Sequence, residues 1–113
     1  MTEQDGGAPA AALRIAAGPP DEGSIGRVVR LAEHPISIGR SEDNDLVLAD
    51  PSALIARRHC AIEPVDGGWR LAVFGVNGVT LNGAWVGAGE SGPLLAGDAL
   101  RIGDYVLAVE APT

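Results

Sequence analysis

Apolar residues recur at every second position in short runs along most of this chain. Because side chains alternate between the two faces of a β-strand, this period predicts strands with one buried face. No window shows sustained apolar spacing at three and four residues, and residues 52–58 could form one helical turn at most. The runs are Leu13 and Ile15, Ile36 and Ile38, Leu46 and Leu48, Cys60 and Ile62, Trp69, Leu71 and Val73, Leu100 and Ile102, and Leu107 and Val109.

Turn-forming residues separate these runs. Asn82-Gly83 lies between 79–81 and 84–86, and this dipeptide accepts the positive φ angles of a two-residue hairpin turn. Asp66-Gly67-Gly68 predicts a second hairpin, and the Gly and Pro residues of 18–23 cannot continue a strand. About ten short, mainly antiparallel strands without helices predict an all-β sandwich.

The alternation also predicts which side chains are buried. Once one residue of a strand is placed in the core, the faces of its neighbours follow. We expect Cys60, Ile62, Trp69, Leu71 and Leu81 to be buried between two sheets, with Glu63 and Arg70 facing water.

The length of 113 residues fits one domain, whose core buries about two-thirds of the surface that the unfolded chain exposes. Residues 1–10 show no periodicity and are expected to be a disordered tail, leaving residues 11–113 as the domain. The first residues are acidic and polar, unlike a secretory signal, and no apolar run approaches the ~20 residues that cross a bilayer. A cytoplasmic protein without membrane insertion is expected.

The formal net charge of -7 argues against a nucleic-acid or anionic-membrane partner, since either would require clustered positive charge. All eight basic residues are arginines. The planar guanidinium can hold a carboxylate or phosphate with two parallel hydrogen bonds. Individual arginines are therefore candidates for binding an anionic group.

No catalytic residue, cofactor or metal is expected. His59 and Cys60 are adjacent on a predicted strand and point to opposite faces, so Cys60 is interpreted as a core residue. A single cysteine also excludes an internal disulfide and a zinc site with several thiolates. The glycines of 87–92 match a dinucleotide-binding pattern, but Pro93 follows instead of a helix, so a loop is predicted.

Two further candidates have simpler interpretations. The segment 43–45 (Asp-Asn-Asp) begins like a calcium loop but lacks the glycine and closing glutamate, so we interpret it as a solvated turn. His34 has no partner in the sequence and is expected to be structural or on the surface.

Four short motifs occur in order within this all-β pattern. They are Gly39-Arg40-Ser41, Ala56-Arg57-Arg58-His59, Asn77-Gly78 and Gly97-Asp98. Their order and spacing resemble the forkhead-associated (FHA) domain, which carries a Gly-Arg, a Ser-x-x-His, an Asn-Gly-Thr-x-x-Asn-Gly stretch and a late Gly-Asp. The resemblance extends from about Leu13 to Val109.

The resemblance implies a module that binds a threonine-phosphorylated protein or peptide. By position, Arg40, Ser41, Arg57 and Asn77 would line the phosphopeptide groove, while Gly39, His59 and Gly78 would shape its loops. Arg57 is expected to point toward Arg40 and Asn77, with Arg58 facing away, because successive residues near a strand diverge. Within the family, residues 48–51 and 55–59 resemble members associated with bacterial type VI secretion.

The chain departs from the family pattern where hydroxyl groups usually occur. Ala56 stands in place of the serine, Gly75 and Val76 replace a hydroxyl pair, and Val79 replaces the threonine after Asn-Gly. Two lost hydroxyl contacts correspond to about a ten- to several-hundred-fold weaker phosphate affinity. The sequence leaves open a second hypothesis, a degenerate scaffold that docks a partner independently of phosphorylation, through the same loops or a sandwich face.

Overall fold

The computed structural model describes residues 12–19, 25–31, 34–49, 54–66 and 68–111. These residues contain strands and turns and no helix. The strands are β1 (Ala12–Ala17), β2 (Val28–Arg30), β3 (Ile36–Gly39), β4 (Leu46–Val47), β5 (Cys60–Val65), β6 (Gly68–Val73), β7 (Val79–Leu81), β8 (Ala84–Val86), β9 (Ser91–Leu94), β10 (Ala99–Ile102) and β11 (Tyr105–Glu110).

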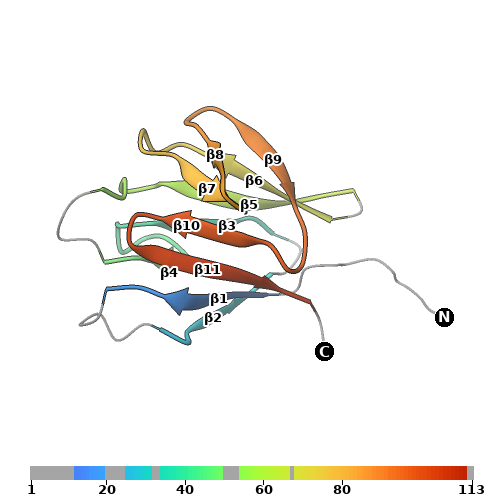
Figure 1. The fold of residues 1–113 in the computed structure, drawn as a ribbon, viewed down its shortest axis with the longest axis horizontal. Coiled ribbons are helices and arrows are strands. Elements are labelled where there is room, and N and C mark those ends of the chain that lie inside the picture. Colours follow the sequence, from blue (N-terminus) through green and yellow to red (C-terminus); the bar gives the residue numbers. More distant parts are fainter. Residues whose placement is uncertain (1–11, 20–24, 32–33, 50–53, 67, 112–113) are drawn as a thin grey trace.

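The strands form two sheets (Figure 1). The six-stranded sheet has the order β2-β1-β11-β10-β7-β8, and the five-stranded sheet has the order β4-β3-β5-β6-β9. The β3–β4 pair is parallel, whereas β5 pairs antiparallel with both β3 and β6. This architecture confirms the predicted all-β sandwich of mainly antiparallel strands.

The core lies between the sheets and is made of alternate residues from both. Cys60, Ile62, Trp69 and Leu71 are buried, as predicted from the alternation. Leu81 differs, because it is only half-buried and packs at the margin of the core. Its strand β7 belongs to the β7–β8 hairpin at the edge of the six-stranded sheet, where fewer neighbours cover a side chain.

Residues predicted to face water lie on the outer face of the five-stranded sheet. Arg70 is exposed, Glu63 is half-buried, and the two are cross-strand partners with an ion pair of 3.1 Å. The register of β5 and β6 is therefore the predicted one. His34, which was expected to be structural or on the surface, is exposed.

The two predicted hairpins are present as tight connections. Leu81 pairs with Ala84, so Asn82 (φ 51°) and Gly83 (φ 86°) form the predicted two-residue turn with positive φ at both positions. Val65 pairs with Gly68, which agrees with the predicted hairpin between β5 and β6. Local turn chemistry alone was enough to predict both connections.

The prediction of a loop over residues 87–92 is wrong in its second part. Ser91–Leu94 forms β9, which pairs with β6 at the edge of the five-stranded sheet. Its Ser-Gly-Pro-Leu sequence has no alternating apolar pattern, and Pro93 is tolerated because it lies on an edge strand. β2 was also not predicted, since its adjacent Val28 and Val29 show no alternating apolar pattern.

The predicted tail, residues 1–10, lies outside the described residues, as do residues 20–24 and 50–53 within the turns discussed above. Within the described part of the chain, no helix is long and apolar enough to span a membrane.

Candidate functional site

The segment 54–59, which leads into β5, is the point on which two other loops converge. Arg40, in the loop after β3, donates from its backbone N–H to the Ala56 carbonyl at 3.0 Å and from Nε to the Ile55 carbonyl at 3.0 Å. Asn77, in the loop before β7, donates from Nδ2 to the Leu54 carbonyl at 2.9 Å. Arg40 and Asn77 are therefore held on adjacent peptide groups of one segment.

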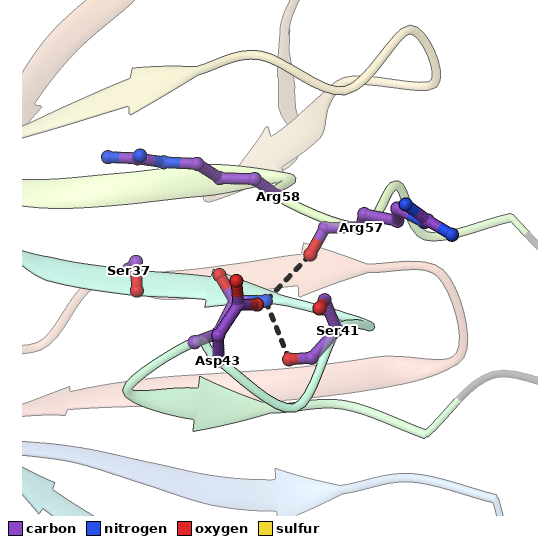
Figure 2. Close-up of a pocket in the computed structure, with 6 residues that line it drawn as sticks. Ser37, Ser41, Asp43, Arg57 and Arg58 are labelled. Atoms are coloured by element: carbon purple, nitrogen blue, oxygen red, sulfur yellow. Dashed lines mark hydrogen bonds between the residues drawn. The ribbon is translucent and has the colours of Figure 1, made fainter.

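The loop after β3 is fixed to Arg57 by a second set of hydrogen bonds. The Ser41 N–H donates to the Arg57 carbonyl at 3.1 Å. Asn44 Nδ2 donates to the same carbonyl at 2.6 Å and to the Ser41 carbonyl at 2.8 Å (Figure 2). A Cβ at Gly39 would lie 2.2 Å from the Arg57 oxygen, so only glycine allows this close approach.

The interpretation of 43–45 as a solvated turn is therefore incomplete. Asn44 joins two loops through its side chain, and the Asp45 carboxylate accepts hydrogen bonds from Ser37 N–H at 2.9 Å and from Ser37 Oγ at 3.2 Å. Both side chains hold the turn in place, a role that the sequence did not indicate because the partners lie up to 13 residues away.

His59 connects the segment 54–59 to the loop that carries Asn77. Its side chain is 1% exposed. Nδ1 accepts a hydrogen bond from the Ala56 N–H at 3.0 Å, so the proton of the neutral ring is on Nε2, which donates to the Gly78 carbonyl at 2.8 Å. A Cβ at Gly75 would lie 2.3 Å from His59 Nδ1, so the imidazole occupies the space that a side chain at position 75 would need.

Trp85, on β8, supports the Asn77 loop from the other side. Its Nε1 donates to the Asn77 carbonyl at 3.3 Å, and a Cβ at Gly78 would lie 2.4 Å from that nitrogen. Gly78 has φ +70°, which also favours glycine. The sequence analysis missed Trp85, and no pattern around it indicates this contact.

Beside these loops lies a pocket of about 190 Å³. Arg57 and Arg58 both contribute to it, and Figure 2 shows their side chains extending in opposite directions, as expected for successive residues. The Arg58 guanidinium lies over the Phe74 ring, 5.4 Å from its centroid. The choice of Arg57 as the one directed at Arg40 and Asn77 stays a prediction. The pocket is lined by Ser37, Ser41, Asp43, Asn44, Arg57 and Arg58.

Two ionisable groups in this region have shifted pKa values. A hydrogen bond from the Ser41 side chain is the main cause that lowers the pKa of Asp43, with smaller contributions from its own backbone N–H and from Arg57 and Arg58. Burial raises the pKa of the Cys60 thiol to about 12, so this thiol is not an activated nucleophile. No group of three or more potential metal ligands occurs among the residues that the structure describes.

The four residues predicted to line the groove are thus connected through the segment 54–57. Arg40 and Asn77 are bonded to its carbonyls, Ser41 is bonded to the Arg57 carbonyl, and Ser41 and Arg57 share the pocket. No hydroxyl comes from Ala56 or Gly75, and Val76 is 83% exposed at the tip of its loop. The arrangement offers guanidinium and amide donors to an anionic ligand.

Comparisons with known proteins agree on one family. The family model for the FHA domain matches residues 36–103. A structure solved for the structural and functional analysis of phosphothreonine-dependent FHA domain interactions is 30% identical, with a TM-score of 0.73, and the match covers 92% of this chain and 98% of that one. The search of curated proteins finds no match.

Two further structures resemble this one. The FhaA FHA domain, solved in complex with the intracellular domain of Rv3910, is 31% identical with a TM-score of 0.71, covering 89% of this chain and 100% of that one. The FHA domain of a hypothetical protein from Arabidopsis thaliana is 25% identical with a TM-score of 0.77, covering 100% and 96%. The likeness therefore extends over nearly the whole described sandwich.

Proposed function

Since the chain belongs to the FHA-domain family, we propose that it is a protein-interaction module that binds a threonine-phosphorylated partner and is not an enzyme. A related domain of 30% identity is described by its phosphothreonine-dependent interactions. In this proposal the loops after β3, before β5 and before β7 bind the peptide, and the sandwich holds those loops in position.

One observation carries the proposal: Arg40 and Asn77 are hydrogen-bonded to the neighbouring carbonyls of Ile55 and Leu54. The bond to Ile55 uses only Nε of Arg40. Within the part of the chain that the structure describes, no hydrogen bond uses the terminal amino groups of this exposed guanidinium, and their geometry matches the oxygens of a phosphate. In this proposal the amide of Asn77, bonded to the adjacent Leu54 carbonyl, binds the backbone of the same peptide.

The other predicted residues have supporting roles. Arg57 adds a second positive charge, and Ser41 adds the hydroxyl nearest to Arg40 in the sequence. Gly39, His59 and Gly78 shape the loops, because each allows or makes a close contact that fixes one loop on another. Since Ala56, Gly75 and Val76 contribute no hydroxyl, we expect weaker phosphate binding than a full set of donors would give.

A second candidate function is docking of a partner protein without phosphate. It is favoured by Val76, an apolar side chain that is 83% exposed where the family usually carries a hydroxyl. It is also favoured by Gly75, where the imidazole of His59 leaves no room for a serine. In this case the same loops would contact an unmodified segment of the partner.

Calorimetric titration with matched peptides distinguishes the two functions. Each phosphothreonine peptide of a library is compared with its unphosphorylated twin on the intact chain. Binding that depends on the phosphate supports the leading proposal. Equal affinity for both members of each pair, or no binding by either, would contradict it and leave the phosphate-independent module.

A further inference from the structure

Hydrogen bonds hold the backbone of Asn77 and Gly78 from two sides. From the interior, His59 Nε2 donates to the Gly78 carbonyl at 2.8 Å, and the Gly78 N–H donates to the Gly75 carbonyl at 2.9 Å. From β8, Trp85 Nε1 donates to the Asn77 carbonyl at 3.3 Å. The contact from β8 therefore acts on the peptide group of the residue whose amide is proposed to bind the ligand.

The indole of Trp85 is fixed in place although the residue is 64% exposed. At one end of the ring, a Cβ at Gly78 would lie 2.4 Å from Nε1, and at the other end a Cβ at Gly87 would lie 2.7 Å from Cη2. Gly78 precedes β7 and Gly87 follows β8, so the ring spans the open end of the β7–β8 hairpin. The two glycines thus provide the space in which the indole reaches the Asn77 carbonyl.

The closed end of the same hairpin is attached to the turn before β10. Asn82 Nδ2 donates to Asp98 Oδ1 at 2.8 Å, and the Ala99 N–H donates to Asn82 Oδ1 at 2.9 Å. Asp98 Oδ2 accepts another hydrogen bond, from the Leu95 N–H at 2.8 Å. We call Asn82, Asp98 and Ala99 the hairpin clamp. It gives the late Gly-Asp motif a structural partner in the hairpin turn.

Strand β8 depends on such contacts because burial does little to hold it. It lies at the edge of the six-stranded sheet, where β7 is its neighbour (Figure 1). Ala84 and Trp85 are exposed, and Val86 is the residue of this strand that packs partly against the core. The position of Trp85 is therefore set by the pairing with β7 and by the hairpin clamp.

We propose that Trp85 is a positioning residue for phosphopeptide binding, which holds the peptide group of Asn77 so that the Asn77 amide is presented to the ligand. The hairpin clamp at Asn82 keeps Trp85 in place from the far end of the hairpin. This inference rests on the proposed phosphopeptide function. A loop that is already ordered loses less conformational freedom on binding, so the contact contributes to affinity without touching the ligand.

The first test measures the affinity of Trp85 variants for one phosphothreonine peptide by calorimetry. Trp85→Ala removes the hydrogen bond and the ring, and should weaken binding about two- to twelvefold. Trp85→Phe keeps an aromatic ring beside the two glycines but loses the N–H, so its loss should be smaller. Ile25→Ala is the control, because Ile25 is 53% exposed and lies just before β2 at the opposite edge of the sheet. It should change affinity by less than about twofold.

A double-mutant cycle with Asn77→Ala distinguishes positioning from a general loss of structure. In the Asn77→Ala background, Trp85→Ala should change affinity by less than about twofold, because the group that Trp85 positions is gone. Asn82→Gly removes the side-chain bonds of the hairpin clamp while a glycine still accepts the positive φ of the turn. It should weaken binding about twofold or more in the wild type and have no effect beside Asn77→Ala. Thermal melts confirm that all variants are folded.

A second measurement needs no ligand. The Asn77 side chain donates to the Leu54 carbonyl at 2.9 Å, and its NH2 signals in an NMR spectrum are assigned by their loss in Asn77→Ala. These signals should move toward those of a free amide in Trp85→Ala and in Asn82→Gly. They should stay unchanged in Ile25→Ala.

The outcomes separate this inference from the proposed function. Wild-type affinity in a folded Trp85→Ala variant, equal losses with and without Asn77, or unmoved Asn77 signals overturn the positioning role and leave the function standing. Wild-type affinity in Asn82→Gly overturns the part of the hairpin clamp. Failure of every chain, the wild type included, to bind the phosphopeptide overturns the proposed function and this role with it.

Discussion

The interior of the sandwich and the loops around the segment 54–59 are stabilised in different ways. The interior consists of alternate apolar side chains from two sheets, among them Ile62 and Leu71, which are fully buried. The loops are joined by a small number of hydrogen bonds from single side chains, such as Asn44 and His59, and by glycines at close contacts. Stability in the first region is spread over many residues, whereas geometry in the second depends on individual ones.

The largest effect should come from breaking the interior. Ile62→Ala removes a side chain with 0% exposure and leaves a cavity between the sheets. We expect the free energy of unfolding to fall by about 2–5 kcal/mol, measured by urea denaturation. Val65→Ala, at an exposed end of the same strand, is the control and should change stability far less. Similar losses in both variants would contradict the assigned register.

The second largest effect should be on ligand affinity rather than on stability. Arg40→Ala removes a charge-assisted donor, so affinity for a phosphothreonine peptide should fall by ~1.5–3 kcal/mol, or about ten- to a hundred-fold. Arg40→Lys should rescue binding only in part, because it keeps the charge but loses the planar pair of donors. Titration calorimetry measures both variants.

Two controls keep lost binding apart from lost stability. Arg40 is exposed, so the Arg40→Ala variant should lose about 1 kcal/mol of stability or less in a thermal melt, which is the contribution expected of the hydrogen bond to Ile55. Arg101→Ala removes an exposed arginine from β10, outside the loops, and should leave peptide affinity unchanged. Unchanged affinity in a folded Arg40→Ala variant would place the phosphate site elsewhere.

A smaller effect is expected where the two regions meet. Gly75→Ala would place a Cβ 2.3 Å from His59 Nδ1, so the imidazole must move and its hydrogen bonds to Ala56 and Gly78 weaken. We expect a loss of about 1–3 kcal/mol in unfolding free energy together with weaker peptide binding. Gly92→Ala, on β9 with no atom within 4 Å of the added Cβ, is the matched control. Equal stability of the two variants would mean that the loop adapts without His59.

The smallest expected effect is a gain in phosphopeptide affinity. Val76→Thr restores a hydroxyl at an exposed tip, so stability should hardly change, while phosphopeptide affinity should rise by about 0.5–1.5 kcal/mol, or two- to twelvefold. Val28→Thr, on β2 at the opposite edge of the six-stranded sheet from β8, should not change binding. No gain from Val76→Thr would favour the phosphate-independent function.

The same difference explains which features the sequence could predict. Alternation placed Cys60, Ile62 and Leu71 correctly because a strand repeats its rule at every second residue. Asn82-Gly83 was predicted because its turn depends on two adjacent residues. Strand β9 was not predicted, since its edge position is set by pairing with β6 and not by its own composition.

The candidate site was predicted as a set of motifs, but its construction was not. The contact of Asn44 with the Arg57 carbonyl, the fit of His59 against Gly75 and the support of Asn77 by Trp85 all join residues from different loops. Such contacts depend on tertiary folding and leave no local pattern in the sequence. Motif order selected the candidate residues, whereas the contacts between their loops are seen only in the folded structure.

The hydrogen bond between Ala56 N–H and His59 Nδ1 provides a natural reporter for isotope exchange. Most protected amides of a sandwich are bonded to carbonyls of neighbouring strands and report on the sheets. This amide is bonded to the imidazole that joins two of the loops proposed to bind the peptide, so its deuterium uptake follows the opening of those loops. A peptide that bridges the loops should slow uptake at Ala56 while amides deep in β5 keep their rates, which makes one backbone position a probe of occupancy.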